Sequence, residues 1–203
     1  MLETLKSGGI LMIPIILCGI IATFIIIERC IYFHSIKKKD NELVKNVNDI
    51  LRTGNHEGCV VAAAAVNTPL SLVIRKAIEC RNYQEADLKD TVETQMDYVV
   101  PQFEHLLTAL GTIANIATLL GLLGTVTGNI KAFGVLGSGG SMGDPAILAG
   151  AIAEALVTTV AGLCVSIPSL IFHNYFINQV NHQIVEMEAR VSELLLKLTG
   201  RIR

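Results

Sequence analysis

The chain has 203 residues, a formal net charge of −2, 51% hydrophobic residues and a mean hydropathy of +0.53. A net charge so close to zero gives no indication of a nucleic-acid partner. The five cysteines form no C-x-x-C pair and have no histidine spacing suited to zinc, so we expect free thiols and no metal or cofactor. Three long, nearly uncharged stretches instead predict an all-α integral membrane protein.

The first apolar stretch, from about Gly8 to Ile27, is long enough to cross a bilayer as a helix, since about 20 apolar residues suffice. A cleaved signal peptide is the alternative, but the apolar run is long, its charged flank is weak and no A-x-A site follows. The lysines at 37–39 are typical of the cytoplasmic side. We therefore assign residues 1–34 to a first transmembrane helix with its N-terminus outside.

Residues 35–105 form a predicted cytoplasmic helical insert. Helical patterns cover four segments: Asn41–Leu51, a stretch that ends near Val66, Leu70–Cys80 and a helix that begins at Asp87. The simplest interpretation is a small helical domain with solvated charged faces. A docking surface for cytosolic partners is the alternative, and no residue distinguishes the two. Pro101 either kinks the last helix or marks its end near the membrane.

The second predicted transmembrane helix covers residues 106–134. Small and polar residues recur on one face of it: Thr108, Gly111, Thr112, Asn115, Thr118, Thr125 and Asn129. Isolated threonines in membrane helices usually bond to their own backbone, but seven aligned positions favour a face that lines water or an ion. Gly124 and Gly128 point elsewhere and form a G-x-x-x-G pattern, which is typical of close helix packing.

The third predicted transmembrane helix, 146–176, follows a short outer loop, 135–145, that has no lysine or arginine. It carries Glu154, although a charge at the centre of a bilayer costs about 2.5–3.5 kcal/mol. Small and polar residues fill one half of this helix: Gly150, Ala151, Glu154, Ala155, Thr158, Thr159, Gly162, Ser166 and Ser169. Bulky apolar residues fill the other half. We expect the bulky half to meet lipid or pack, and the polar half to face protein, water or an ion.

Residues 177–203 form a predicted amphipathic cytoplasmic helix. Its apolar residues recur at helical spacing between Gln179 and Leu198, and its basic residues are typical of the inner side. Of the 16 basic residues in the chain, only Lys6 and Lys131 fall outside or at the outer membrane edge. The predicted topology is three spans, with the N-terminus outside and the C-terminus in the cytoplasm.

Two long motifs resemble the MotA/TolQ/ExbB ion-channel family. They are L-L-G-L-L-G-T-V-T-G-N-I-K-A-F at 119–133 and A-I-A-E-A-L-V-T-T-V-A-G-L-C-V-S-I-P at 151–168, joined through a G-D-P loop and followed by N-Y-F at 174–176. Three spans with an outer N-terminus are similar to the ExbB/TolQ branch, because the flagellar stator branch has four spans and a longer chain.

This resemblance implies a homopentamer in the bacterial inner membrane, with a central pore that holds the helices of a small single-span partner similar to ExbD or TolR. The partner supplies an ionisable aspartate. By motif, this chain supplies Thr125, Glu154 and Thr159 to the ion pathway. The resemblance also implies that ion flow drives work on the cell envelope, such as energising outer-membrane transport, through a periplasmic energy-transducing or envelope protein.

The chain departs from the family pattern at three places. Ala117-Thr118 stands where the family commonly has Ala-Pro, Asn129 replaces a small or apolar residue, and Thr158 replaces an alanine that many proton-type members have. Added oxygen atoms suit a hard cation, so the transported ion is either a proton or sodium. We therefore add Thr158 to the ion pathway. Secondary pore-face candidates are Asn115, Thr118 and Asn129, and helix-packing candidates are Gly124, Gly128 and Gly162.

Two alternatives remain beside the envelope motor. The same fold serves flagellar or gliding propulsion, which would require a charged surface on the insert that contacts a rotor. A non-conducting membrane scaffold would tolerate apolar replacements at Glu154 and Thr125. We do not expect an enzyme, because no nucleophile–base pair and no metal-binding constellation is visible in the sequence.

Overall fold

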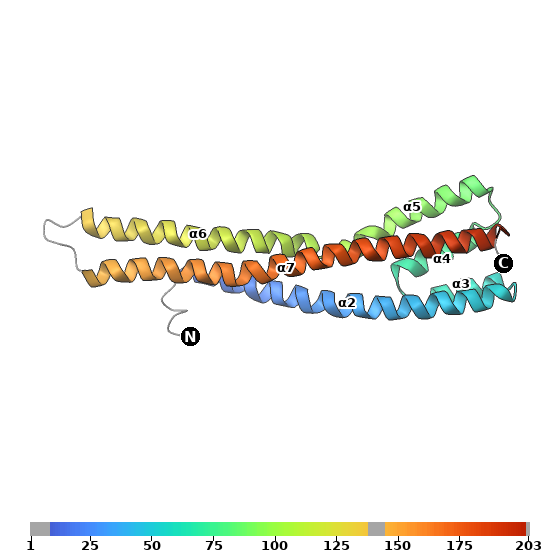
Figure 1. Ribbon diagram of the computed structural model, residues 1–203, viewed down its shortest axis with the longest axis horizontal. Helices are drawn as coiled ribbons and strands as arrows, with labels where there is room; N and C mark the ends of the chain where they lie inside the picture. The colour runs from blue at the N-terminus through green and yellow to red at the C-terminus, as the bar shows by residue number, and fades with distance from the viewer. Residues whose placement is uncertain (1–8, 138–144, 202–203) are drawn as a thin grey trace. The chain divides into compact units, whose positions relative to one another are not determined.

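The structure is a computed structural model that describes residues 9–137 and 145–201, and these residues form helices and short connections (Figure 1). The helices are α2 (Met12–Arg52), α3 (His56–Ala64), α4 (Pro69–Glu79), α5 (Glu85–Glu104), α6 (Leu107–Gly137) and α7 (Pro145–Leu198). The predicted all-α fold is therefore confirmed for the described residues. Three helical stretches are long and apolar enough to cross a membrane: α2, the stretch Glu85–Gly134 and α7.

Two helices continue well beyond the apolar stretches. We expected separate helices after each stretch, but α2 runs unbroken from Met12 to Arg52 and α7 from Pro145 to Leu198. No glycine or proline lies between residues 27 and 52, or between 169 and 199, so nothing in either segment interrupts a helix. α6 extends to Gly137, into the predicted outer loop. Residues 138–144, Lys6 and Arg203 lie outside the described residues.

The break before α6 lies beyond Pro101. This proline sits in the last turn of α5, which ends at Glu104. The chain turns at His105 and Leu106, and Leu106 has a φ of 66°. A positive φ is uncommon for a leucine because its Cβ crowds the backbone. The proline therefore lies inside α5, close to its end, and the break follows at His105 and Leu106.

The chain divides into two compact units. Unit 1 comprises residues 1–28 and 106–175, and unit 2 comprises residues 29–105 and 176–203. Each of the two longest helices, α2 and α7, contributes one part to each unit.

In unit 1, α6 and α7 run side by side in opposite directions (Figure 1) and meet along small residues, which we call the small-residue seam. The seam consists of Ala114, Ala117, Gly121, Gly124, Gly128 and Ala132 on α6, and of Ala151, Ala155, Thr158, Gly162, Ser166 and Ser169 on α7, all of them buried. A Cβ atom on Gly162 would lie 2.5 Å from the carbonyl oxygen of Ala117. The two backbones therefore approach too closely for larger residues.

α2 packs against α7 in the same unit. A Cβ atom on Gly19 would lie 3.1 Å from a methyl carbon of Val165. Large apolar side chains cover the outer surfaces of the three helices; among the exposed ones are Ile13, Ile20 and Phe24 on α2, Leu119 and Leu122 on α6, and Leu156, Val160 and Ile167 on α7. The bulky half predicted for α7 is thus exposed, and most of its small and polar half is buried or half-buried.

Unit 2 contains α3, α4, α5 and parts of α2 and α7. Its helix α4 starts with a capping box, in which Thr68 and Ser71 satisfy each other's backbone N–H groups, and with Pro69 in the first turn. α3 packs on α4, and α4 packs on α5. The rings of Phe33 and Phe176 stack at 5.8 Å between their centroids and join α2 to α7. Unit 2 thus has a buried core of its own, and the predicted helix Asn41–Leu51 is part of α2.

Replacing Gly162 with alanine tests the close approach in unit 1. We expect Gly162→Ala to lower the free energy of unfolding by about 1–3 kcal/mol, because the new methyl group overpacks the seam. Gly150→Ala is the control, since a Cβ atom there meets nothing within 4 Å in the same helix. The check is thermal unfolding of both variants in lipid nanodiscs. A melting temperature of Gly162→Ala at or above that of the wild type would contradict the tight seam.

Candidate functional site

Thr159 links the two helices at the middle of the seam. Its hydroxyl donates a 2.8 Å hydrogen bond to the carbonyl oxygen of Gly121 on α6, and lies 3.3 Å from the carbonyl oxygen of Ala155 on its own helix. Gly121 makes this contact possible, because a Cβ atom there would lie 3.3 Å from the Thr159 backbone. The Thr159 hydroxyl therefore reaches α6 only because the backbones of α6 and α7 lie so close together at Gly121.

Thr158 lies in the seam, with 1% of its surface exposed. Its hydroxyl donates to the carbonyl oxygen of Glu154 at 2.8 Å, one turn earlier on α7. Its methyl group fills the notch at Gly124, where an added Cβ atom would lie only 2.5 Å away. Gly128 makes the next close contact, with Ala155. In this arrangement Thr158 packs the helices together, and its hydroxyl points to its own backbone.

The polar candidates on α6 lie outside the small-residue seam and are at least partly exposed. Asn115, Thr118 and Asn129 are exposed, and Thr125 is half-exposed. The Thr125 hydroxyl donates to the carbonyl oxygen of Leu122 at 2.6 Å. Because a hydroxyl that donates one hydrogen bond keeps its two acceptor lone pairs, such a threonine still offers oxygen to a cation or to water.

Thr118 is exposed and also bonds across to α7. Its hydroxyl donates to the hydroxyl oxygen of Ser166 at 2.6 Å. This contact ties the polar face of α6 to the seam. The structure thus brings Thr118, Thr158 and Thr159 to the α6–α7 contact, whereas Asn115 and Asn129 remain on the exposed surface.

Glu154 forms an ion pair that we did not predict. A carboxylate oxygen of Glu154 lies 2.8 Å from the ammonium nitrogen of Lys131 on α6, and the two side chains are 28% and 58% exposed. Lys131 is the only Asp, Glu, Lys or Arg residue in the predicted span 106–134, and Glu154 is the only one in the predicted span 146–176. Opposite charges alone in two neighbouring membrane helices are the signal that could have indicated this pair.

Gly9 covers another side of the same carboxylate. Its φ is +65°, and a Cβ atom on it would lie 2.1 Å from the Glu154 Oε1 atom. A larger residue therefore has neither the backbone conformation nor the space at this position. Glu154 thus contacts three segments of unit 1: the start of the α2 region, α6 and its own helix.

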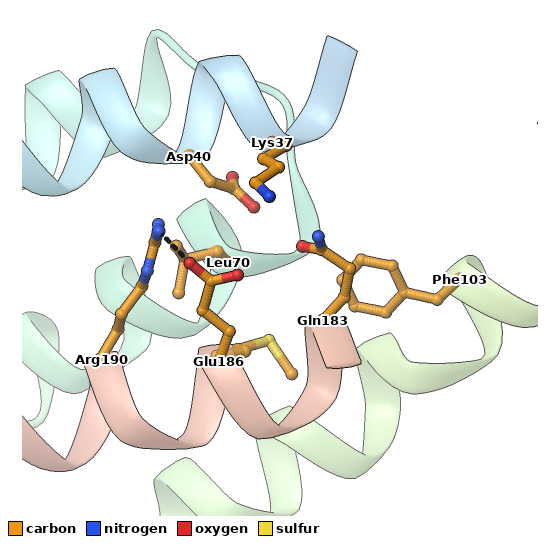
Figure 2. A pocket seen from close by; sticks show the side chains of 8 residues that line it. Lys37, Asp40, Leu70, Phe103, Gln183, Glu186 and Arg190 are labelled. Carbon is orange, nitrogen blue, oxygen red and sulfur yellow. Dashed lines mark hydrogen bonds and ion pairs between the residues drawn. The ribbon is translucent and has the colours of Figure 1, made fainter. Parts of the chain in front are cut away.

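A second polar cluster lies in unit 2 around Asp40, which the sequence did not single out (Figure 2). Asp40 is 5% exposed, and its Oδ1 atom has no hydrogen-bond partner among the residues that the structure describes. It borders a cavity of about 10 Å³, room for about one water molecule. The other residues around the cavity are Lys37, Leu70, Phe103, Gln183, Glu186, Met187 and Arg190.

Burial raises the pKa of Asp40 above its ordinary value of 3.8. A hydrogen bond with Thr68 and the charge of Arg190 lower this pKa, and the charge of Glu186 raises it further. Arg190 also pairs with Glu186 and donates to the side-chain oxygen of Asn41. The cavity is bordered by two acidic residues, Asp40 and Glu186, and by two basic residues, Lys37 and Arg190, so the numbers of acidic and basic groups are equal.

The pKa of Asp40 predicts a pH-dependent stability. The unfolded chain loses the Asp40 proton near pH 3.8 and the folded chain loses it at a higher pH. Ionised Asp40 therefore destabilises the fold increasingly as pH rises from about 4 towards neutral. We expect Asp40→Asn to stabilise the protein more at about pH 7 than at about pH 4. Thermal unfolding of both proteins at the two pH values measures this, and an equal difference at both would contradict the burial effect.

Comparisons with known proteins agree with the sequence motifs. Residues 65–189 match the MotA/TolQ/ExbB proton channel family. The chain is 27% identical over 191 residues to the putative biopolymer transport protein ExbB-like 3 of Synechocystis, covering 94% of this chain and 91% of the relative. It is 27% identical over 200 residues to the biopolymer transport protein ExbB of Neisseria meningitidis, covering 92% and 89%. It is 34% identical over 100 residues to the Tol-Pal system protein TolQ of Haemophilus influenzae, covering 48% and 43%. The chain belongs to the MotA/TolQ/ExbB proton channel family.

Proposed function

We propose that this chain is the channel-forming subunit of an ExbB/TolQ-like inner-membrane motor, which couples ion flow to work on the cell envelope such as outer-membrane transport. The observation that carries the proposal is a carboxylate and several hydroxyls within a unit whose outer surface is strongly apolar. Family membership and the ExbB and TolQ relatives support the same function. A propulsion stator is not favoured.

The exposed polar face of α6 supports assembly into a pore. Polar side chains in a membrane are stable only against protein or water, and Asn115, Thr118 and Asn129 are exposed on a single chain. A homopentamer turns these faces towards a common axis, where they surround the helices of an ExbD/TolR-like partner that carries a membrane aspartate. In this arrangement the bulky apolar residues of this chain's own membrane helices face lipid.

Ion movement supplies the energy in this proposal. A cation that crosses the membrane potential releases about 2.3 kcal/mol per charge per 100 mV. The cation passes from the outer side to the partner's aspartate, with Glu154 and the oxygens of Thr125 and Thr159 replacing part of its hydration shell. Thr158, which we had added to the ion pathway, is buried in the seam and instead packs α6 against α7. Neutralising the aspartate changes which of the five subunits the partner helix prefers. The partner then steps around the ring and transmits the motion to an envelope protein.

The proposed topology has the N-terminus outside and the C-terminus in the cytoplasm. It rests on the lysines at 37–39 and on the basic residues of the tail. Unit 2 is then cytoplasmic, which fits its exposed charged side chains. The Lys131–Glu154 pair is then near the outer side.

Two substitutions separate a conducting subunit from a scaffold. We expect Thr159→Val and Glu154→Gln each to abolish growth or uptake that depends on the complex, because each removes an oxygen or a charge from the pathway. Assays with and without sodium identify the ion. Co-purification of the variants with the partner measures assembly.

Thr23→Val is the matched control for this experiment. It removes a hydroxyl from the same unit, but that hydroxyl is exposed on α2 and donates to Gly19 on its own helix at 2.8 Å. We expect Thr23→Val to retain function. If Thr159→Val and Glu154→Gln also assemble and retain function, the chain does not conduct ions through these residues and the scaffold becomes the better account.

A further inference from the structure

We propose that Lys131 is a tethered cation that closes the Glu154 site, and that a transported ion must displace it. This inference rests on the proposed function, because it assumes that Glu154 lies on the ion pathway. Lys131 lies within the 119–133 motif, but it is not among the residues that the resemblance assigned to the ion pathway.

The ion pair places a positive charge where a transported cation would bind. The Lys131 ammonium lies 2.8 Å from the Glu154 carboxylate, which is within hydrogen-bonding distance. A carboxylate in a membrane helix is costly when it is alone and less so when it is paired. Lys131 therefore compensates the charge of Glu154 when no transported ion is present.

Two groups lie directly against the Oε1 atom of Glu154. The Gly9 backbone covers Oε1 so closely that a Cβ atom would lie 2.1 Å away. Lys131 contacts the same oxygen from α6. Ala151 and Thr158, one turn away along α7, are buried in the seam. A cation that takes the place beside this oxygen from the α6 side therefore competes with the Lys131 ammonium.

Lys131 is the group that moves more easily. Its side chain is 58% exposed and ends in a flexible four-carbon stem. It can leave the carboxylate by rotation about its own bonds, whereas α6 remains fixed to α7 by the seam. A partly exposed ion pair of this kind is also weak enough to be broken by a competing cation.

The first test is a zero-length cross-link in the complete complex in liposomes. A water-soluble carbodiimide activates the Glu154 carboxylate, the neutral amine of Lys131 attacks the activated carbon, and a urea leaves as the amide bond forms. Mass spectrometry of the linked α6 and α7 peptides measures the yield. The Lys197–Glu193 pair on α7, at 2.5 Å, is an internal reference for the reactivity of the reagent.

We expect the Lys131–Glu154 cross-link to form, and its yield relative to the reference to fall as the transported cation is added. For sodium the series is run at constant pH, and for protons the reference corrects for the effect of pH on the reagent. Absence of the cross-link, or a relative yield that neither cation changes, would overturn the proposal.

The second test separates the gate from the proposed function. We expect Lys131→Gln to raise passive ion uptake into liposomes by about fivefold, because the carboxylate loses its competitor. Lys131→Arg should retain the low uptake, since it keeps the positive charge, and Lys197→Gln controls for the loss of a lysine elsewhere. If Glu154→Gln abolishes uptake but Lys131→Gln leaves it unchanged, the gate is wrong and the channel stands. If neither variant changes uptake, the proposed function fails as well.

Discussion

The close approach of α6 to α7 is the constraint on which unit 1 depends. Gly121 and Gly162 have no side chains, so the two backbones can approach closely. A Cβ atom added to Gly162 would lie only 2.5 Å from the carbonyl oxygen of Ala117. Lipid offers no hydrophobic driving force between helices, so packing and interhelical hydrogen bonds must hold them. The Thr159 hydroxyl supplies such a bond to Gly121. The glycines and the threonine therefore act together, and neither is explained without the other.

This constraint also determines where the polar groups lie. With its small residues committed to the seam, α6 has Asn115 and Asn129 on another side, exposed on the single chain. On α7 the seam buries Thr158 and leaves Glu154 at its edge, within reach of Lys131. One helix pair thus provides a rigid contact and, beside it, a polar surface that a membrane makes unstable unless protein or water covers it. This exposed polar surface is the observation that supports the proposed assembly into a channel.

Helical periodicity made much of this predictable from the sequence. The division of residues 146–176 into a small polar half and a bulky half corresponds closely to burial in the structure, because about 100° per residue fixes which side chains share a face. The Lys131–Glu154 pair was missed because it depends on how α6 and α7 are aligned with each other. The periodicity of a single helix does not determine that alignment. Asp40 was missed because it follows three exposed lysines and so resembles a solvated charge. Its burial depends on the packing of unit 2.

The central claim is that the polar face of α6 meets water in the assembled complex. The most direct measurement is the reaction of a membrane-impermeant maleimide with single cysteines, introduced into a variant that lacks the five native cysteines. Cysteines at Asn115 and Thr125 test the polar face, and cysteines at Ile116 and Leu123, which are exposed apolar positions on the other side of the helix, test the surface expected to meet lipid. The account predicts reaction at the first two positions and protection at the last two. Equal reactivity at all four, or protection of all four, would contradict it.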